Sequence, residues 1–233
     1  MTSTNKKARI AGLFYIFLVI AAPWRLMYIP GKLFVRGDAT ATAANIAANE
    51  SLFRFGLFSD LLTGVIMLFL VLALYKLFKD VDKTQAILMV ILGGLMITPI
   101  YFLNVLNDAG ALMLVRGGGY LAVFDKSQLD ALAMLFLRLH SHGVLVNEIF
   151  WGLWLFPFGI LVIKSGFLPR FLGVIMILNG IAYLILSLTG LLFPDNQTAV
   201  ARFLFPVLHG ELVTMLWLLI KGVNEQTSGS PAT

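Results

Sequence analysis

The sequence predicts an all-α fold: a polytopic integral membrane protein built as a six-transmembrane-helix bundle with a short outer surface helix. Composition is the first reason, because 59% of the 233 residues are hydrophobic and 12% are charged, whereas soluble domains are about 45–50% apolar and about 25% charged. The second reason is the mean hydropathy of +0.91, which agrees with a membrane composition. The third reason is that six apolar stretches each reach the roughly 20 residues that cross the hydrocarbon core.

These stretches fill the chain. We therefore expect a single six-span transmembrane domain over residues 1–223, followed by a polar flexible tail over residues 224–233. The spans are predicted at residues 9–28, 52–78, 85–107, 132–163, 170–192 and 198–220. The first imitates a signal peptide, but its apolar run leads into Pro23 and Trp24 without an A-x-A cleavage site, which predicts an uncleaved helix.

Basic residues indicate the orientation. An even number of spans places both termini on one side, and nine Lys and Arg residues lie on that side, mostly in short connections: Lys6, Lys7, Arg9, Lys76, Lys79, Lys83, Lys164, Arg170 and Lys221. Eight lie on the other side, but four of these are in or beside helices where acids could pair with them: Arg25, Arg54, Arg138 and Arg202. This distribution, read with the positive-inside rule, predicts that both termini are cytoplasmic. The net charge is +5, but the positive residues cluster at helix ends and no nucleic-acid recognition motif accompanies them. We therefore expect a lipid bilayer as partner and no nucleic acid.

Local signals predict further features. Asp38 stands before the Ala-rich run and is expected to cap a short surface helix over about 39–49. Gly117 to Gly119 predict a flexible hinge. Prolines inside four spans predict kinks: Pro23, Pro99, Pro157 and Pro206. Four glycines are expected to mark close helix contacts: Gly93, Gly94, Gly173 and Gly180.

The stretch "LRLHSHGVLVNEIF", residues 137–150, places polar side chains in the fourth span. This span is about 48 Å long, well beyond a hydrocarbon core of about 30 Å, so His140 and His142 are expected near the outer boundary. Arg138, His142 and Glu148 share one helix face, and His140 lies on the opposite side. We expect the face that holds His142 to turn toward Asp60 and the sixth span in the bundle interior.

Other polar residues complete this pattern. Asp60, Asn104 and Asp108 fall at a similar outer depth, whereas His209 and Glu211 lie near the midplane, counted from Lys221. A charged residue at the centre of a span costs about 2.5–3.5 kcal/mol on insertion scales. Glu211 is therefore expected to be neutral, paired or facing water.

Three blocks of the sequence resemble a bacterial family of membrane proteins, the domain of unknown function 4386. They are "RGDATATAANIAANESLFRFGLFSDLL", "SGFLPRFLGVIMILNGIAYL" and "GELVTMLWLLIKG", the last of which holds Glu211 at a matching acidic position. The resemblance implies a six-helix integral membrane protein in the bacterial cytoplasmic (inner) membrane. It implies almost nothing about activity.

The preferred functional hypothesis is a binding or transport site for a small polar molecule or lipid headgroup in the outer half of the bundle. Ionisable groups within membrane helices are candidates for such a site. Its residues would be Asp60, Arg138, His142, Glu148 and Glu211. The simplest alternative is that these polar groups only satisfy each other, with Arg54 or Arg138 paired to Asp60 or Glu148.

Two further hypotheses remain open. The first is an intramembrane metal-dependent hydrolase acting on lipids, with zinc held by His142, His209 and Asp60 and with Glu148 or Glu211 as the base. The chain has no cysteine, so thiolate metal sites are excluded. The second is a non-catalytic structural or regulatory subunit of a membrane complex.

Overall fold

A computed structural model describes residues 3–223 and places six apolar helical segments long enough to cross a membrane. They are Ser3–Leu33, Glu50–Phe78, Lys83–Arg116, Lys126–Ser165, Arg170–Leu192 and Pro194–Lys221. The predicted all-α polytopic fold with six spans is confirmed, and the described residues hold no strand. The predicted flexible tail, residues 224–233, lies outside the described residues.

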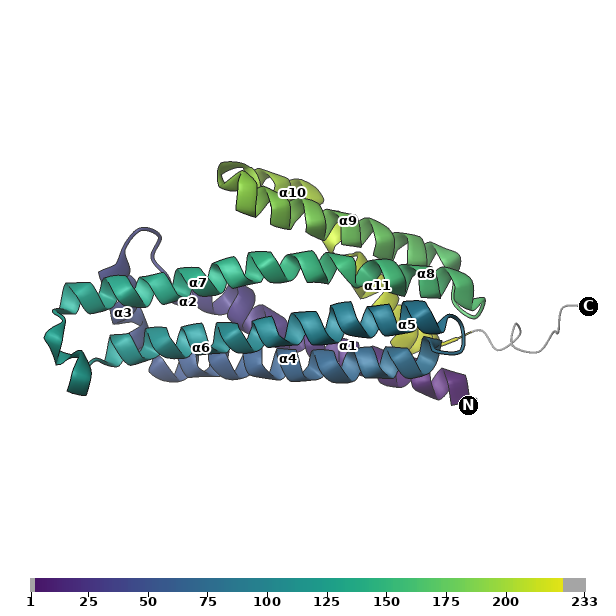
Figure 1. The fold of residues 1–233 in the computed structure, drawn as a ribbon, viewed down its shortest axis with the longest axis horizontal. Coiled ribbons are helices and arrows are strands. Elements are labelled where there is room, and N and C mark those ends of the chain that lie inside the picture. Colours follow the sequence, from purple (N-terminus) through teal and green to yellow (C-terminus); the bar gives the residue numbers. More distant parts are fainter. Residues whose placement is uncertain (1–2, 224–233) are drawn as a thin grey trace, which may run out of the picture. The chain divides into compact units, whose positions relative to one another are not determined.

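The elements follow the chain as drawn in Figure 1. The first half contains α1 (Ser3–Pro23), the π-helical segment η1 (Trp24–Tyr28), α2 (Ile29–Leu33), α3 (Ala39–Ala48), α4 (Glu50–Phe78), α5 (Lys83–Val90), the π-helical segment η2 (Ile91–Met96) and α6 (Ile97–Arg116). The second half contains the 3-10 segment η3 (Gly119–Val123), α7 (Lys126–Leu153), α8 (Leu155–Ser165), α9 (Arg170–Leu192), the 3-10 segment η4 (Pro194–Asn196), α10 (Gln197–Leu208), α11 (Gly210–Leu216) and the π-helical segment η5 (Trp217–Lys221).

The chain forms two compact units. The first unit consists of the described parts of Met1–Phe17, Ile66–Thr98 and Leu145–Thr233, and the second unit consists of Leu18–Val65 and Pro99–Val144. In the second unit a hydrophobic core joins residues of α2, α3, α4, α6 and α7, among them Ile29, Ile46, Phe53, Ala111 and Leu137.

The short outer helix is present as α3, next to α2 in the second unit. The Asp38 carboxylate accepts a hydrogen bond from the backbone N–H of Ala41 at 2.8 Å, which is the predicted N-cap. One side of α3 is buried at Ala43 and Ile46, and the Asn45 amide donates to the Leu33 carbonyl at 3.1 Å. The alanine-rich helix therefore packs on protein.

Each of the four prolines lies near an interruption in its span. Pro23 directly precedes η1, where the backbone N–H of Ile29 bonds to the Trp24 carbonyl, five residues back. The other interruptions are η2 before Pro99, Trp154 before Pro157, and His209 after Pro206. Proline removes one helical N–H donor and crowds the preceding turn, and π-helical turns and kinks are often found near it.

Glycines bring two helix pairs of the first unit together. A Cβ atom built on Gly180 would lie 2.8 Å from the Gly152 carbonyl, and one on Gly173 would lie 2.5 Å from the Gly159 carbonyl. The second of these pairs joins α8 to α9, which lie side by side in Figure 1. The close contacts predicted at Gly173 and Gly180 are therefore confirmed, as is the contact of Gly93, where a Cβ would lie 2.9 Å from a Val71 methyl group.

Candidate functional site

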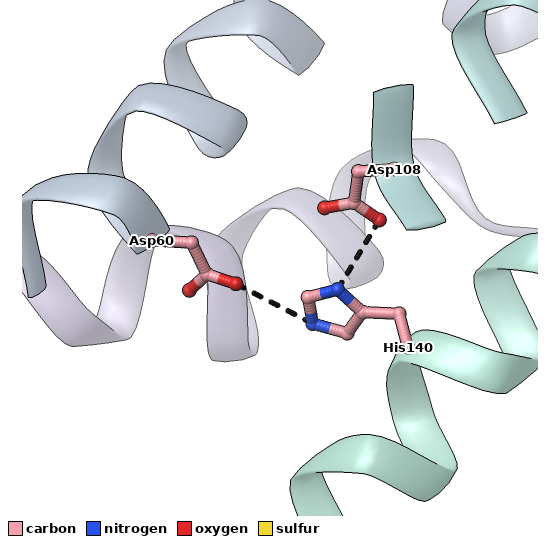
Figure 2. A group of neighbouring side chains, drawn as sticks. All are labelled: Asp60, Asp108 and His140. Atoms are coloured by element: carbon pink, nitrogen blue, oxygen red, sulfur yellow. Dashed lines mark ion pairs between the residues drawn. The ribbon is translucent and has the colours of Figure 1, made fainter. Parts of the chain in front are cut away.

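Four charged or ionisable side chains meet inside the second unit: Arg25 from η1, Asp60 from α4, Asp108 from α6 and His140 from α7. Each is at most 4% exposed. Figure 2 shows the His140 ring between the two carboxylates, with one ring nitrogen toward each. Burying charged groups is costly unless they are paired, so the arrangement of the four groups determines what the cluster can do.

The position of Arg25 depends on the π-helical turn in the first span. Pro23 precedes the π-helical turn that contains Arg25. The Ser59 hydroxyl donates to the Ala21 carbonyl at 2.6 Å, which fastens α4 to this part of the span. Gly56 leaves room for the Arg25 stem, because a Cβ built there would lie 3.3 Å from Arg25 Cδ.

Arg25 and Asp108 form a bidentate ion pair. Arg25 Nε donates to Asp108 Oδ2 at 2.5 Å, and Nη2 donates to Oδ1 at 2.7 Å. The guanidinium carbon also lies 5.4 Å from the centre of the Phe34 ring. Parallel N–H···O bonds of this kind fix both partners, so Arg25 compensates the charge of Asp108 and holds its carboxylate in place.

His140 is oriented by two acceptors. Its Nδ1 lies 3.3 Å from the Asn104 carbonyl oxygen and 3.3 Å from Asp108 Oδ1. Because a carbonyl oxygen can only accept a hydrogen bond, Nδ1 carries the proton that points at it. In the neutral ring Nε2 then presents a lone pair, which makes it the nitrogen that could bind a metal ion.

Asp60 lies in front of that nitrogen. Asp60 Oδ2 is 3.7 Å from His140 Nε2, longer than the 2.7–3.2 Å of an N–H···O hydrogen bond. Asp60, Asp108 and His140 each offer one atom within 4.8 Å of the others, and this is the group of the described residues that could hold a metal ion. Arg25 is matched to Asp108, and His140 is the ion-pair partner of Asp60 in the described part of the chain.

Comparison with known proteins gives the family. Residues 10–222 match the family described as Domain of unknown function (DUF4386), which covers nearly the whole chain. The chain belongs to this family. It is also 35% identical over 77 residues to an "Uncharacterized protein" of Archaeoglobus fulgidus, an alignment that covers 33% of this chain and 44% of that relative. No solved structure matches the chain.

In this DUF4386 protein two of the predicted site residues are exposed, although they were expected to face the interior of the bundle. His142 and Arg138 are exposed, and His142 Nδ1 donates to the Arg138 carbonyl one turn back at 2.9 Å. His140 is the buried histidine. The expectation that the His142 side of the helix faces inward is therefore wrong: the buried stripe of α7 runs through Ala133, Leu137 and His140.

The remaining predicted residues belong to the first unit. Glu148 is buried and 8% exposed, with Oε2 unpartnered. His209 is exposed, and its Nδ1 donates to the Phe205 carbonyl at 2.7 Å. Glu211 accepts a hydrogen bond from Tyr15 at 2.5 Å. Of the predicted metal ligands, the group described above contains Asp60, whereas His142 and His209 are absent from it.

The expected ion pairs also differ. Arg54 pairs with Glu50 one helical turn away at 2.7 Å, and the partner of Asp60 is His140. Sequence reasoning expected Asp60, Asn104 and Asp108 at one level and His140 near it, but it did not select Asp108, His140 or Arg25 as site residues. The available signal was an arginine within an apolar span, directly after a proline, because such a charge requires an acidic partner.

Proposed function

We propose that this integral membrane protein binds a divalent metal ion between Asp60 and His140, in the outer half of its helix bundle. The observation that carries the proposal is the 3.7 Å separation of Asp60 Oδ2 and His140 Nε2. Two ligands about 2.1 Å from a tetrahedral ion lie about 3.4 Å apart. The two atoms are thus too far apart for a hydrogen bond and close to the separation that an ion needs.

The surrounding groups support this assignment. Asp108 and the Asn104 carbonyl hold the proton on Nδ1 of His140. This is how metal-bound histidines are commonly oriented, with a carboxylate or carbonyl on the second nitrogen. Arg25 keeps Asp108 in the role of orienting His140, because both Asp108 carboxylate oxygens accept hydrogen bonds from the guanidinium.

The donor set narrows the choice of ion. One imidazole nitrogen with a carboxylate oxygen suits zinc, iron or manganese in the divalent state. Two protein ligands leave coordination positions open, and oxygen atoms of a small polar ligand or a lipid headgroup would occupy them. We therefore propose that the binding or transport role consists of holding such a ligand through the metal ion. Zinc is the first ion to test.

The hydrolase hypothesis uses the same open positions. A metal ion held by Asp60 and His140 could supply an activated water for hydrolysis of a lipid ester, which would make the protein an intramembrane lipid hydrolase. An assay of lipid hydrolysis with the metal-loaded protein separates this alternative from binding alone. For the membrane itself, we propose the bacterial cytoplasmic (inner) membrane with both termini cytoplasmic, which protease or label accessibility of the two ends would test.

The deciding experiment compares two histidines of one helix. The detergent-purified protein is loaded with zinc, desalted and subjected to elemental analysis, beside His140→Ala, Asp60→Asn and the matched control His142→Ala. We expect about one zinc per chain in the wild type and in His142→Ala, and a loss in the other two variants. Retention of the metal in His140→Ala, or no metal in the wild type, would overturn the proposal.

A further inference from the structure

A second polar centre lies in the first unit, around Glu211 of α11. The Tyr15 hydroxyl donates to Glu211 Oε2 at 2.5 Å, and the Tyr183 hydroxyl also bonds to this carboxylate. Tyr15 is 1% exposed. No Lys, Arg or His nitrogen of the described residues lies within ion-pair distance of Glu211. The carboxylate is therefore held by neutral donors, and its charge has no cationic counterpart in this part of the chain.

Aromatic rings surround the two tyrosines. The Tyr15 ring lies 6.2 Å from the Trp154 ring, and the Tyr183 ring lies 5.7 Å from the Trp151 ring. Trp154 is 2% exposed, and the absence of a side chain on Gly93 admits its indole, since a Cβ there would lie 3.2 Å from Trp154 Cε3. Aromatic faces carry negative charge density and attract cations.

Two buried oxygens on the helices that carry Tyr183 and Glu211 have no hydrogen-bond partner. Asn179 Oδ1 and Thr214 Oγ1 are unpartnered, and both residues are fully buried. Asn179 precedes Tyr183 by four residues on α9, and Thr214 follows Glu211 by three residues on α11, so each shares a helix face with its neighbour. Helices α9 and α11 pack against each other. Unpartnered buried acceptors call for a donor or a positive charge.

From this arrangement we propose that Glu211, Tyr15, Tyr183 and Trp154 form a binding site for a small organic ammonium ion. The carboxylate supplies the opposite charge, the rings supply the aromatic faces, and Asn179 and Thr214 accept N–H bonds from a primary ammonium group. This site lies in the first unit and is separate in residues from the Asp60–His140 site.

Depth argues for a free ion and against a lipid headgroup. Glu211 stands ten residues before Lys221, about 15 Å along a helix, which is half of a hydrocarbon core of about 30 Å. The headgroup of a bilayer lipid stays at the interface. The proposed occupant is therefore a soluble ammonium compound.

The test measures binding of choline and ethanolamine to the full-length protein in detergent, by calorimetry and by tryptophan fluorescence. The charge control is the uncharged analogue of choline in which carbon replaces nitrogen. We expect at least one of the two cations to bind more tightly than the analogue. Glu211→Gln should weaken that binding about tenfold or more, and Trp154→Phe by about two- to tenfold.

Matched variants separate this site from other effects. Glu148→Gln removes another buried carboxyl of the same unit, and His140→Ala removes the metal ligand of the second unit; both should keep wild-type affinity. A Glu211→Gln protein that elutes and melts like the wild type shows that binding, not folding, has changed. If neither cation binds better than the neutral analogue, or if Glu211→Gln binds as tightly as the wild type, the proposal is wrong.

Discussion

Replacing Arg25 by methionine tests whether the buried ion pair stabilises the second unit. Methionine keeps much of the length and apolar volume of the arginine stem but removes both hydrogen bonds to Asp108, at 2.5 and 2.7 Å. The pair is almost completely enclosed, with side-chain exposures of 2% and 0%. After the substitution Asp108 stays buried with His140 Nδ1, 3.3 Å away, as its remaining side-chain partner.

The expected magnitude follows from these contacts. Breaking one side of a buried ion pair costs about 3–5 kcal/mol, because the other charge is left uncompensated. Side-chain hydrogen bonds within membranes average only about 0.6 kcal/mol, since the unfolded chain in the membrane also finds partners. We therefore expect a loss near the lower end of the range for buried pairs, about 3 kcal/mol.

The free energy of unfolding is measured by denaturant titration in mixed micelles. The matched control is Arg54→Met, which breaks the ion pair with Glu50 on the surface of α4, where the side chains are 51% and 32% exposed. Such a pair contributes little, so we expect little change. The double variant Arg25→Met/Asp108→Leu should recover part of the loss, because the uncompensated carboxylate is gone. Equal losses in Arg25→Met and Arg54→Met would refute the reasoning.

Two further predictions concern helix packing and pH. Gly180→Ala places a Cβ 2.8 Å from the Gly152 carbonyl, so it should lose about 1–3 kcal/mol relative to Gly31→Ala, where nothing lies within 4 Å. Thermal unfolding of the two variants would measure this, and equal melting temperatures would contradict it. At the α5 N-terminus, Lys164 donates to Asp82 at 2.7 Å and holds the pKa of that carboxyl below its usual range. The resulting stability is present above the unfolded-state pKa of about 3.9 and is lost as the pH falls through the lower folded-state pKa. Asp82→Asn should therefore flatten the acid side of the melting curve against pH, and an unchanged acid side would exclude this contribution.

Part of the candidate site could be predicted from the sequence. Counting residues along apolar spans predicts that Asp60, Asp108 and His140 lie at a similar level, because the thickness of the bilayer fixes the length of a crossing helix. The inward face of α7 could not be predicted in the same way. In a soluble helix, apolar residues mark the buried side, but in lipid both sides are apolar and the pattern does not distinguish them. The pattern of apolar residues therefore could not show whether His140 or His142 is the buried histidine, and the packing of α7 decided it.

The sequence by itself determined the class of this protein, the number of its spans, the Asp38 cap and the positions where prolines interrupt the helices. These features depend on local chemistry: a crossing segment must be apolar and must satisfy its own backbone hydrogen bonds. Only the tertiary structure decided the partners of the buried charges. Arg25 meets Asp108 across 83 residues of chain, and Tyr15 meets Glu211 across 196 residues. Such pairings depend on which helices pack together and on their rotation, and neither is encoded in the spacing of residues along one span.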